Sequence, residues 1–237
     1  MEKKALYLIA VAGGSGTRMG AQTPKQFLPL SGRPILLRTL ERFVEAVPDI
    51  HIVTVLPKDH IDTWKDICIR YSFFRPQRLV VGGITRFHSV RAALSQVPSG
   101  ALVAVHDGVR PLVTVRMIRD MVARMDRCRA LIPVLPVTDT LKLLERTPDG
   151  ELQTKSGPAP DRSFLYGAQT PQLFRSEDIL KAYDQPFDTS FTDDASVAEH
   201  IGIPLSWTEG EPFNLKITRP EDLVFAEAVL ASRGETN

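Results

Sequence analysis

The chain has few cysteines and no apolar run long enough to cross a bilayer. Only Cys68 and Cys128 occur in its 237 residues, and their spacing matches neither a metal-binding nor a redox motif. The two cysteines therefore indicate reduced thiols, as in proteins of the cytoplasm. No segment approaches the ~20 apolar residues that a transmembrane helix needs, and the apolar run at the N-terminus is too short for a signal peptide. We therefore expect a soluble cytoplasmic protein.

The sequence also lacks an excess of charge of either sign. It contains 29 Lys and Arg against 28 Asp and Glu, which gives a formal net charge of +1. Bulk electrostatics therefore gives no reason to expect a nucleic-acid or membrane partner. The hydrophobic content of 43% and the charged content of 24% are ordinary for a globular protein. The length suits one α/β domain, and we expect residues 1–237 to form it.

Strand and helix patterns alternate along most of the chain. Residues 5–11 form a continuous apolar run, which is typical of a strand covered on both faces. Further strands are expected at 50–56, 79–81, 101–106, 130–134, 205–208 and 214–217, and helices at 36–47, 61–68, 87–97 and 118–125 and from Ser176, Thr192 and Thr218. The expected helix caps are Asp59, Thr114, and Thr218 paired with Glu221. This alternation predicts an α/β fold with a Rossmann-like, mostly parallel sheet and helices on both faces.

The alternation stops between Val137 and Tyr166. Residues 140–144 look like a strand, Pro148-Asp149-Gly150 forms a turn, and no apolar stripe here is wide enough to join the core. We expect a β-arm, at about 137–166, that projects from the sheet. Because a lone hairpin is marginal in water, a partner subunit is expected to bury it.

A glycine-rich turn follows the first strand, with the sequence Ala12-Gly13-Gly14-Ser15-Gly16-Thr17-Arg18-Met19. The backbone N–H groups of such a turn bind phosphates, and Arg18 and Lys25 add two cations. The turn is not a dinucleotide fingerprint, because the third glycine is missing, and not a P-loop, because no Gly-Lys-Ser/Thr follows. Glycines with fixed cations predict chemistry on a polyphosphate. The alternative is a plain strand-to-helix turn with a surface arginine.

A second candidate site is the segment from Val105 to Pro111. Asp107 ends a buried strand, where ligands bind in open α/β sheets. Its carboxylate predicts a Mg²⁺ ligand, because Mg²⁺ prefers hard oxygen donors and often bridges phosphates. The alternative is an aspartate that caps the following turn. For Arg110, an ion pair that braces the loop is the simplest role.

Small polar residues follow Gly82-Gly83. Ser89 and the two glycines suit a pocket for a nucleobase or ribose, and equally a turn followed by a helix N-terminus. His88 is expected to be structural or to lie at the rim.

Two later segments carry charge. Asp193 and Asp194 follow Thr192 and resemble an acidic catalytic pair, but adjacent carboxylates after threonine more often mark a helix N-terminus. Thr192 could still reach a ligand. Lys216 is expected to be a surface charge unless the end of its strand faces the glycine turn. The sequence shows no Ser/His/Asp arrangement, no nucleophilic cysteine and no His/Cys cluster, so in-line transfer on a phosphate is favoured over covalent catalysis.

Together these segments resemble the 2-C-methyl-D-erythritol 4-phosphate cytidylyltransferases of the non-mevalonate isoprenoid pathway, from about Leu6 to Ala231. The further motifs that carry the resemblance are Pro24-Lys25-Gln26, Arg86, Val137-Thr138-Asp139-Thr140, Asp161-Arg162, Gln169-Thr170-Pro171-Gln172 and Lys216-Ile217-Thr218-Arg219-Pro220-Glu221-Asp222. The resemblance implies a fold of the nucleotide-diphospho-sugar transferase type. It also implies an enzyme that transfers a cytidylyl group from CTP to 2-C-methyl-D-erythritol 4-phosphate, with Mg²⁺, and releases pyrophosphate.

The resemblance also assigns roles to residues. Arg18 and Lys25 would stabilise the transition state, and Arg162 and Lys216 would hold the polyol phosphate. The residues expected to bind substrates are Ala12, Gly13, Gly14, Ser15, Gly16 and Thr17 around the triphosphate, Gly83, Ser89, Asp107 and Gly108 around cytosine, ribose and metal, and Thr140, Thr170 and Thr192 beside the polyol phosphate. In this family the arm crosses to the other subunit, which implies a homodimer with Thr140 and Arg162 in the partner's site.

Three positions depart from the family pattern, and other activities compete with this one. Ile84 and Gly108 stand where many relatives carry an acidic residue and an alanine, which leaves base and ribose contacts open. Phe213 stands where relatives often carry a polar residue, so a second metal carboxylate from that segment is not assumed. A ribitol 5-phosphate cytidylyltransferase would have the same fold and CTP site. A uridylyl or guanylyl transferase would share the glycine turn but not the segments of Arg162 and Lys216. A non-catalytic nucleotide-binding regulator would lack one of the key charged residues.

Overall fold

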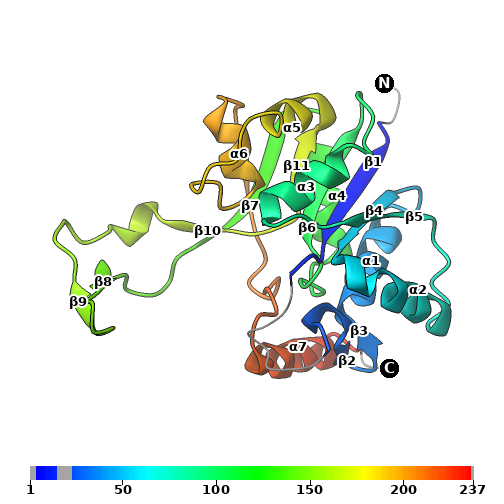
Figure 1. Ribbon diagram of the computed structural model, residues 1–237, viewed down its shortest axis with the longest axis horizontal. Helices are drawn as coiled ribbons and strands as arrows, with labels where there is room; N and C mark the ends of the chain where they lie inside the picture. The colour runs from blue at the N-terminus through cyan, green and yellow to red at the C-terminus, as the bar shows by residue number, and fades with distance from the viewer. Residues whose placement is uncertain (1–3, 15–22, 236–237) are drawn as a thin grey trace.

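A computed structural model describes residues 4–14 and 23–235 and is built on an eight-stranded sheet (Figure 1). The strand order is β10-β7-β11-β6-β1-β4-β5, and β12 pairs with β7 outside this path. The strands are β1 (Leu6–Val11), β4 (His51–Leu56), β5 (Gln77–Val81), β6 (Leu102–Asp107), β7 (Ala130–Pro136), β10 (Tyr166–Ala168), β11 (Gln172–Arg175) and β12 (Ser206–Glu209).

The sheet is mostly parallel, as the alternation of strands and helices predicts. Strands β5, β4, β1 and β6 pair in parallel with one another, and β12 pairs in parallel with β7. Strand β11 lies between β6 and β7 and is antiparallel to both, and β10 pairs antiparallel with β7. The carboxyl ends of β1 and β6 therefore meet at one edge of the sheet.

Helices cover both faces of the sheet. Successive residues of a strand point to opposite faces, so Leu8 packs with α1 (Ile35–Ala46), α2 (Ile61–Arg70) and α4 (Val115–Arg124). Ile9 packs with α3 (Arg86–Leu94), α5 (Ser176–Ala182) and α6 (Asp194–His200). A third apolar cluster joins α7 (Pro220–Ser232) to the short strand β2 (Pro29–Leu30), which pairs with β3 (Arg33–Pro34). The predicted two-faced α/β fold is confirmed.

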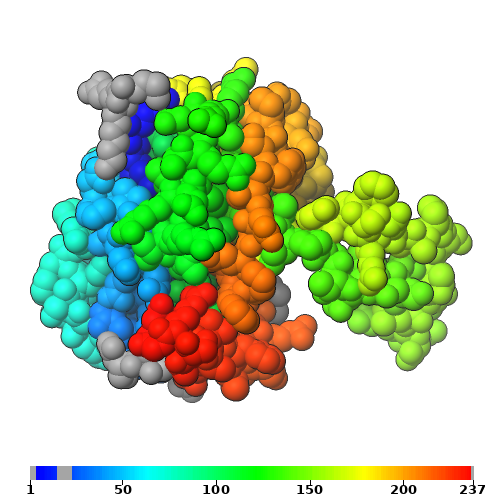
Figure 2. Space-filling view, turned by 180° about the vertical axis from the view of Figure 1, so that it is seen from behind, coloured from blue at the N-terminus to red at the C-terminus, as the bar shows by residue number. Residues whose placement is uncertain are grey.

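The predicted arm leaves the sheet between β7 and β10. Its strands β8 (Leu144–Arg146) and β9 (Leu152–Thr154) form a separate two-stranded sheet, and Gly150 N donates to Thr147 O over 2.9 Å in the turn. Figure 2 shows the arm standing clear of the rest of the molecule. The apolar side chains of Leu152, Phe164 and Tyr166 are exposed there, as expected of a segment without a core of its own.

Several predicted boundaries are wrong for identifiable reasons. The strand expected at 140–144 begins only at Leu144. Residues 214–217 are not a strand, although Ile217 N donates to Val109 O over 2.9 Å, because the segment is held mainly by side chains. Within residues 4–14 and 23–235, single turns of 3₁₀ helix occur at η2 (Lys25–Phe27), η3 (Lys58–His60) and η4 (Arg162–Phe164).

The predicted helix caps had mixed outcomes. Thr114 caps α4, since its hydroxyl accepts from Met117 N over 3.0 Å. Asp59 does not cap α2, because it lies inside η3. At α7 the carboxylate that accepts from Thr218 N, over 2.6 Å, is Asp222 and not Glu221. Among the described residues, no helix combines the length and the apolar character that crossing a membrane requires.

The buried strand β11 gives a test of this core. Phe174 on β11 is fully buried, so Phe174→Ala should lower the free energy of unfolding by about 3–5 kcal/mol, the usual cost of an aromatic cavity. Urea denaturation followed by circular dichroism measures this. Ile69→Ala, on an exposed position of α2, is the control and should change stability by no more than about 0.5 kcal/mol. Equal effects of the two substitutions would contradict the placement of β11.

Candidate active site

The glycine turn and Asp107 lie side by side at the carboxyl ends of β1 and β6. Val11 is the register partner of Asp107, and Gly108 N donates to Val11 O over 2.9 Å. The backbone after β1 is fixed as well, because Gln26 Nε2 donates to Ala12 O over 3.0 Å. Parallel pairing thus brings together the first two predicted sites, which are almost 100 residues apart.

Glycines are required here because the chain segments approach closely. A Cβ atom on Gly83 would lie 2.4 Å from the Cβ of His88, and one on Gly108 would lie 3.1 Å from the Cβ of Ala12. The hydroxyl of Ser89 accepts from Gly83 N over 3.0 Å and is 3.5 Å from the position a Cβ on Gly13 would take. The close packing of these residues leaves backbone, rather than side chains, at the edge of the site.

Asp107 gathers three cations. Its Oδ2 atom is 3.1 Å from Lys216 Nζ and 3.2 Å from Arg110 Nε, and its Oδ1 atom is 3.7 Å from Arg86 Nε. Asp107 is buried, whereas the Lys216 side chain is 41% exposed. The carboxylate does not cap the following turn through a backbone N–H, which was the alternative prediction. The ion pair expected of Arg110 is confirmed.

Arg86 connects this cluster to the interior of the protein. Its NH1 and NH2 groups donate to the two oxygens of Asp194 over 2.9 and 2.6 Å. Asp194 is fully buried, and Tyr183 OH donates to it over 2.6 Å. Asp194 therefore does more than mark a helix N-terminus. The cap of α6 is Asp193, which accepts from Ser196 N over 2.8 Å, as predicted.

Side chains hold the segment that carries Lys216. The amide of Gln169 donates to Glu211 O over 2.9 Å and accepts from Glu211 N over 3.1 Å. Asn214 Nδ2 donates to Thr170 O over 2.8 Å, and Arg110 NH1 donates to Asn214 O over 2.7 Å. These contacts fix the end of this segment, and Lys216 lies against Asp107, the register partner of the last residue of β1.

The protonation states follow from these neighbours. Burial would raise the pKa of Asp107, but Arg86, Lys216 and Arg110 together lower it well below its ordinary value. Burial opposes the charge of Arg86, yet Asp194 raises the pKa of this guanidinium above its ordinary value. Burial lowers the pKa of His106 to about 4, so its imidazole is neutral at pH 7. The site thus combines two carboxylates with three cations.

The donor set near Asp107 limits how a metal could bind. Within residues 4–14 and 23–235, no group of three or more His, Cys, Asp or Glu side chains is placed to hold a metal ion. Of the two carboxylates among the described residues of the cluster, Asp194 is fully buried and engaged by Arg86, so the carboxylate left to meet a metal ion is that of Asp107. Mg²⁺ is commonly bound by one or two carboxylates together with substrate phosphates, so these residues fit an ion that the substrate itself mainly coordinates.

Some of the predicted site residues come together, and others do not. Those gathered at the ends of β1 and β6 are Ala12, Gly13, Gly14, Gly83, Ser89, Asp107, Gly108, Thr170 and Lys216. Lys25 joins them, because its Nζ donates to Ile217 O over 3.2 Å. Thr140 and Arg162 lie on the arm, where Arg162 NH1 donates to Thr138 O over 2.8 Å. Thr192 is exposed next to the cap of α6. Ser15, Gly16, Thr17 and Arg18 lie outside the described residues.

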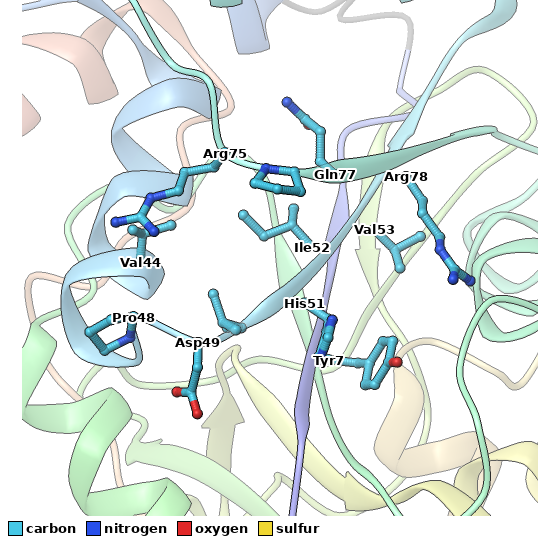
Figure 3. Close-up of a pocket in the computed structure, with 12 residues that line it drawn as sticks. Tyr7, Val44, Pro48, Asp49, His51, Ile52, Val53, Arg75, Gln77 and Arg78 are labelled. Carbon is cyan, nitrogen blue, oxygen red and sulfur yellow. The ribbon is translucent and has the colours of Figure 1, made fainter.

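A separate cavity of about 450 Å³ lies at the opposite edge of the sheet (Figure 3). Its lining includes Tyr7, His51, Arg75 and Arg78, at or near the amino ends of β1, β4 and β5. None of the predicted site residues lines it. Arg78 is engaged with Gln96, whose backbone oxygen accepts from its NH1 group over 3.1 Å.

Comparisons with known proteins agree with this geometry. The family model for 2-C-methyl-D-erythritol 4-phosphate cytidylyltransferase matches residues 6–232. A protein of that name from Porphyromonas gingivalis is 46% identical over 231 residues, which cover 97% of this chain and 100% of the relative. One from Syntrophotalea carbinolica is 39% identical, over 98% of both chains.

Solved structures are similar too. A 4-diphosphocytidyl-2C-methyl-D-erythritol synthase from Anaerococcus prevotii has a TM-score of 0.77 at 29% identity, over 97% of this chain and 100% of the other. The cytidylyltransferase of Thermus thermophilus has a TM-score of 0.69 at 30% identity, over 97% and 100% of the two chains. The chain therefore belongs to the 2-C-methyl-D-erythritol 4-phosphate cytidylyltransferase family.

Proposed function

We propose that this chain transfers a cytidylyl group from CTP to 2-C-methyl-D-erythritol 4-phosphate, which gives 4-diphosphocytidyl-2-C-methyl-D-erythritol and pyrophosphate. The observation that carries the proposal is the position of the cluster of Asp107, Arg110 and Lys216 directly beside the glycine turn. Family membership supports the choice of substrates, since the relatives are named for this activity. The names of the relatives also argue against the alternative activity, a ribitol 5-phosphate cytidylyltransferase.

The reaction is a displacement at phosphorus. An oxygen of the polyol phosphate forms a bond to the α-phosphorus of CTP, and the bond from that phosphorus to the bridging oxygen of the β-phosphate breaks. Negative charge grows on the leaving pyrophosphate. Positioning and fixed positive charge are the main resources for such a step. Backbone N–H groups of Gly13 and Gly14 suit the triphosphate, and the resemblance extends this role to Ser15, Gly16, Thr17 and Arg18.

Two lysines would meet the phosphates. Lys216 is held at 3.1 Å from Asp107 yet is partly exposed, so a phosphate can compete with Asp107 for its ammonium group. Lys25 Nζ lies 3.2 Å from the backbone oxygen of Ile217, the residue that follows Lys216. This arrangement supports Lys216 as a ligand of the polyol phosphate and Lys25 as a cation for the charge that develops in the transition state.

A divalent ion, taken to be Mg²⁺, is part of the proposal. Asp107 would hold it together with phosphate oxygens of CTP, where the ion would neutralise phosphate charge. Without the ion, Asp107 holds Arg110 and Lys216 in place through contacts that the protein makes alone.

The arm supports a homodimer. It carries Thr140 and Arg162 away from the site of its own chain, and it exposes Leu152, Phe164 and Tyr166 (Figure 1). A second copy that packs against the arm would bury those side chains, and the resemblance implies that Arg162 then serves the partner's site. We propose that each site takes its second polyol-phosphate cation from the other subunit.

The first test is the choice of substrate. Purified protein with CTP and Mg²⁺ should release pyrophosphate with methylerythritol 4-phosphate, and much less with ribitol 5-phosphate. A coupled pyrophosphate assay on both polyol phosphates measures this. Turnover with ribitol 5-phosphate alone would replace the proposed function by that alternative, and release with neither would favour a nucleotide-binding regulator.

Removal of the Lys25 ammonium should slow turnover. Lys25→Ala should lower kcat by ~10²-fold or more, because one preorganised charge contact to the transition state is lost. Steady-state kinetics measures the effect. Lys65→Ala is the control, because Lys65 is an exposed lysine of α2 that forms an ion pair with Asp62 on the same helix. A kcat of the Lys25→Ala enzyme within twofold of the wild-type value would show that the assigned role is wrong.

Subunit mixing tests the crossed arm. Arg162→Ala should weaken use of the polyol phosphate and leave CTP binding near normal. When inactive Lys25→Ala and Arg162→Ala subunits are refolded together, part of the activity should return, because one site of each heterodimer then contains both residues. Recovery is measured against each variant refolded alone. If the mixture stays as inactive as its parents, Arg162 serves its own subunit or neither.

A further inference from the structure

We infer that Arg86 and Asp194 are positioning residues for the polyol-phosphate half of the reaction, acting on Lys216 through Asp107. The inference rests on the proposed function. Arg86 bridges two carboxylates from distant parts of the chain, with its NH1 and NH2 groups on Asp194 and its Nε atom facing Asp107 Oδ1 at 3.7 Å.

Asp194 holds Arg86 firmly in one orientation. Both carboxylate oxygens accept from the guanidinium, which is the paired geometry that arginine favours. Asp194 is fully buried and also accepts from Tyr183 OH over 2.6 Å. The NH1 and NH2 groups of Arg86 both donate to Asp194, so the atom that faces Asp107 is Nε. It lies farther from Asp107 than Lys216 Nζ or Arg110 Nε does.

Because Arg86 faces only the Oδ1 atom of Asp107, the Oδ2 atom is left for Lys216. Arg86 lies on the Oδ1 side, so Oδ2 is directed to Lys216 Nζ at 3.1 Å and Arg110 Nε at 3.2 Å. Without the Asp194 carboxylate, the guanidinium would be free to pair with Asp107 directly. The Asp107 charge would then be neutralised by Arg86, and Lys216 would lose the contact that fixes its ammonium group.

Local stability does not explain this arrangement. Asp193 already caps α6, so Asp194 is not needed for that purpose. Arg86 is the first residue of α3, where the helix dipole disfavours a positive charge. The position of Arg86 is explained by its contacts with two carboxylates, Asp194 in the interior and Asp107 in the site.

The test compares two changes to the same buried group. Asp194→Asn removes the charge that holds Arg86, and it should raise KM for methylerythritol 4-phosphate about tenfold or more, the usual value of a charged hydrogen bond. KM for CTP should stay within twofold. Tyr183→Phe is the matched control, because it removes a hydrogen bond to Asp194 but keeps the pair with Arg86. It should lower stability while both KM values stay within twofold of wild type.

Arg86→Lys provides a second variant in case Asp194→Asn does not fold. It keeps the positive charge but cannot form the paired contact, so the same selective rise in KM for the polyol phosphate is expected. Equal rises in both KM values, a fall in kcat alone, or no change in either variant would overturn the positioning role. If the wild-type protein itself transfers no cytidylyl group, the proposed function fails first and the inference fails with it.

Discussion

The whole site depends on one buried carboxylate that holds three cations. Asp107 ends a central strand and draws Lys216, Arg110 and Arg86 from three separate segments of the chain. Taking a charge out of water is costly unless partners compensate for it. Here the compensation is spread over several segments, so the loop after β6, the start of α3 and the segment before α7 are placed relative to one another by the same group.

The surroundings of Asp107 are rigid for simple chemical reasons. His106 is fully buried and neutral, its Nδ1 atom lies 3.1 Å from Thr170 Oγ1, and that hydroxyl accepts from Asp107 N over 3.1 Å. The backbone of Thr170 accepts from Asn214. Strand β6, the segment after β10 and the Lys216 segment are thereby joined by polar contacts. A phosphate that enters the site meets cations already in position, so little reorganisation opposes its binding.

Sequence patterns predicted the parts of this structure that depend on local order. The alternating strands and helices, the arm and the Thr114 cap follow from periodicity and short-range hydrogen bonds, and the glycine turn and Asp107 follow from their place at strand ends. The pairing of Arg86 with Asp194 could not be predicted, because 108 positions separate them and an aspartate opening a helix is usually explained by the helix itself. The roles of Gln169 and Asn214 in holding the Lys216 segment were not predicted, because a buried amide leaves no periodic signal. Residues 214–217 looked like a strand because they alternate in polarity. The roles of all the predicted site residues, including Arg18, Thr140, Arg162 and Thr192, remain predictions.

The insertion of β11 between β6 and β7 has a consequence for how the molecule is assembled. The chain completes β7, travels out through the arm and returns at Gln172 to fill the gap between two strands that were made earlier. Until that return, the sheet consists of two unconnected halves. During synthesis the strands up to β6 can bury their apolar faces early. The joining of β6 to β7 by β11 must wait until the arm has been made, and bringing the two ends of this long segment together has an entropic cost. Asp194 and Lys216 both emerge after this point, so the nascent enzyme completes its charge cluster only in the last stage of folding.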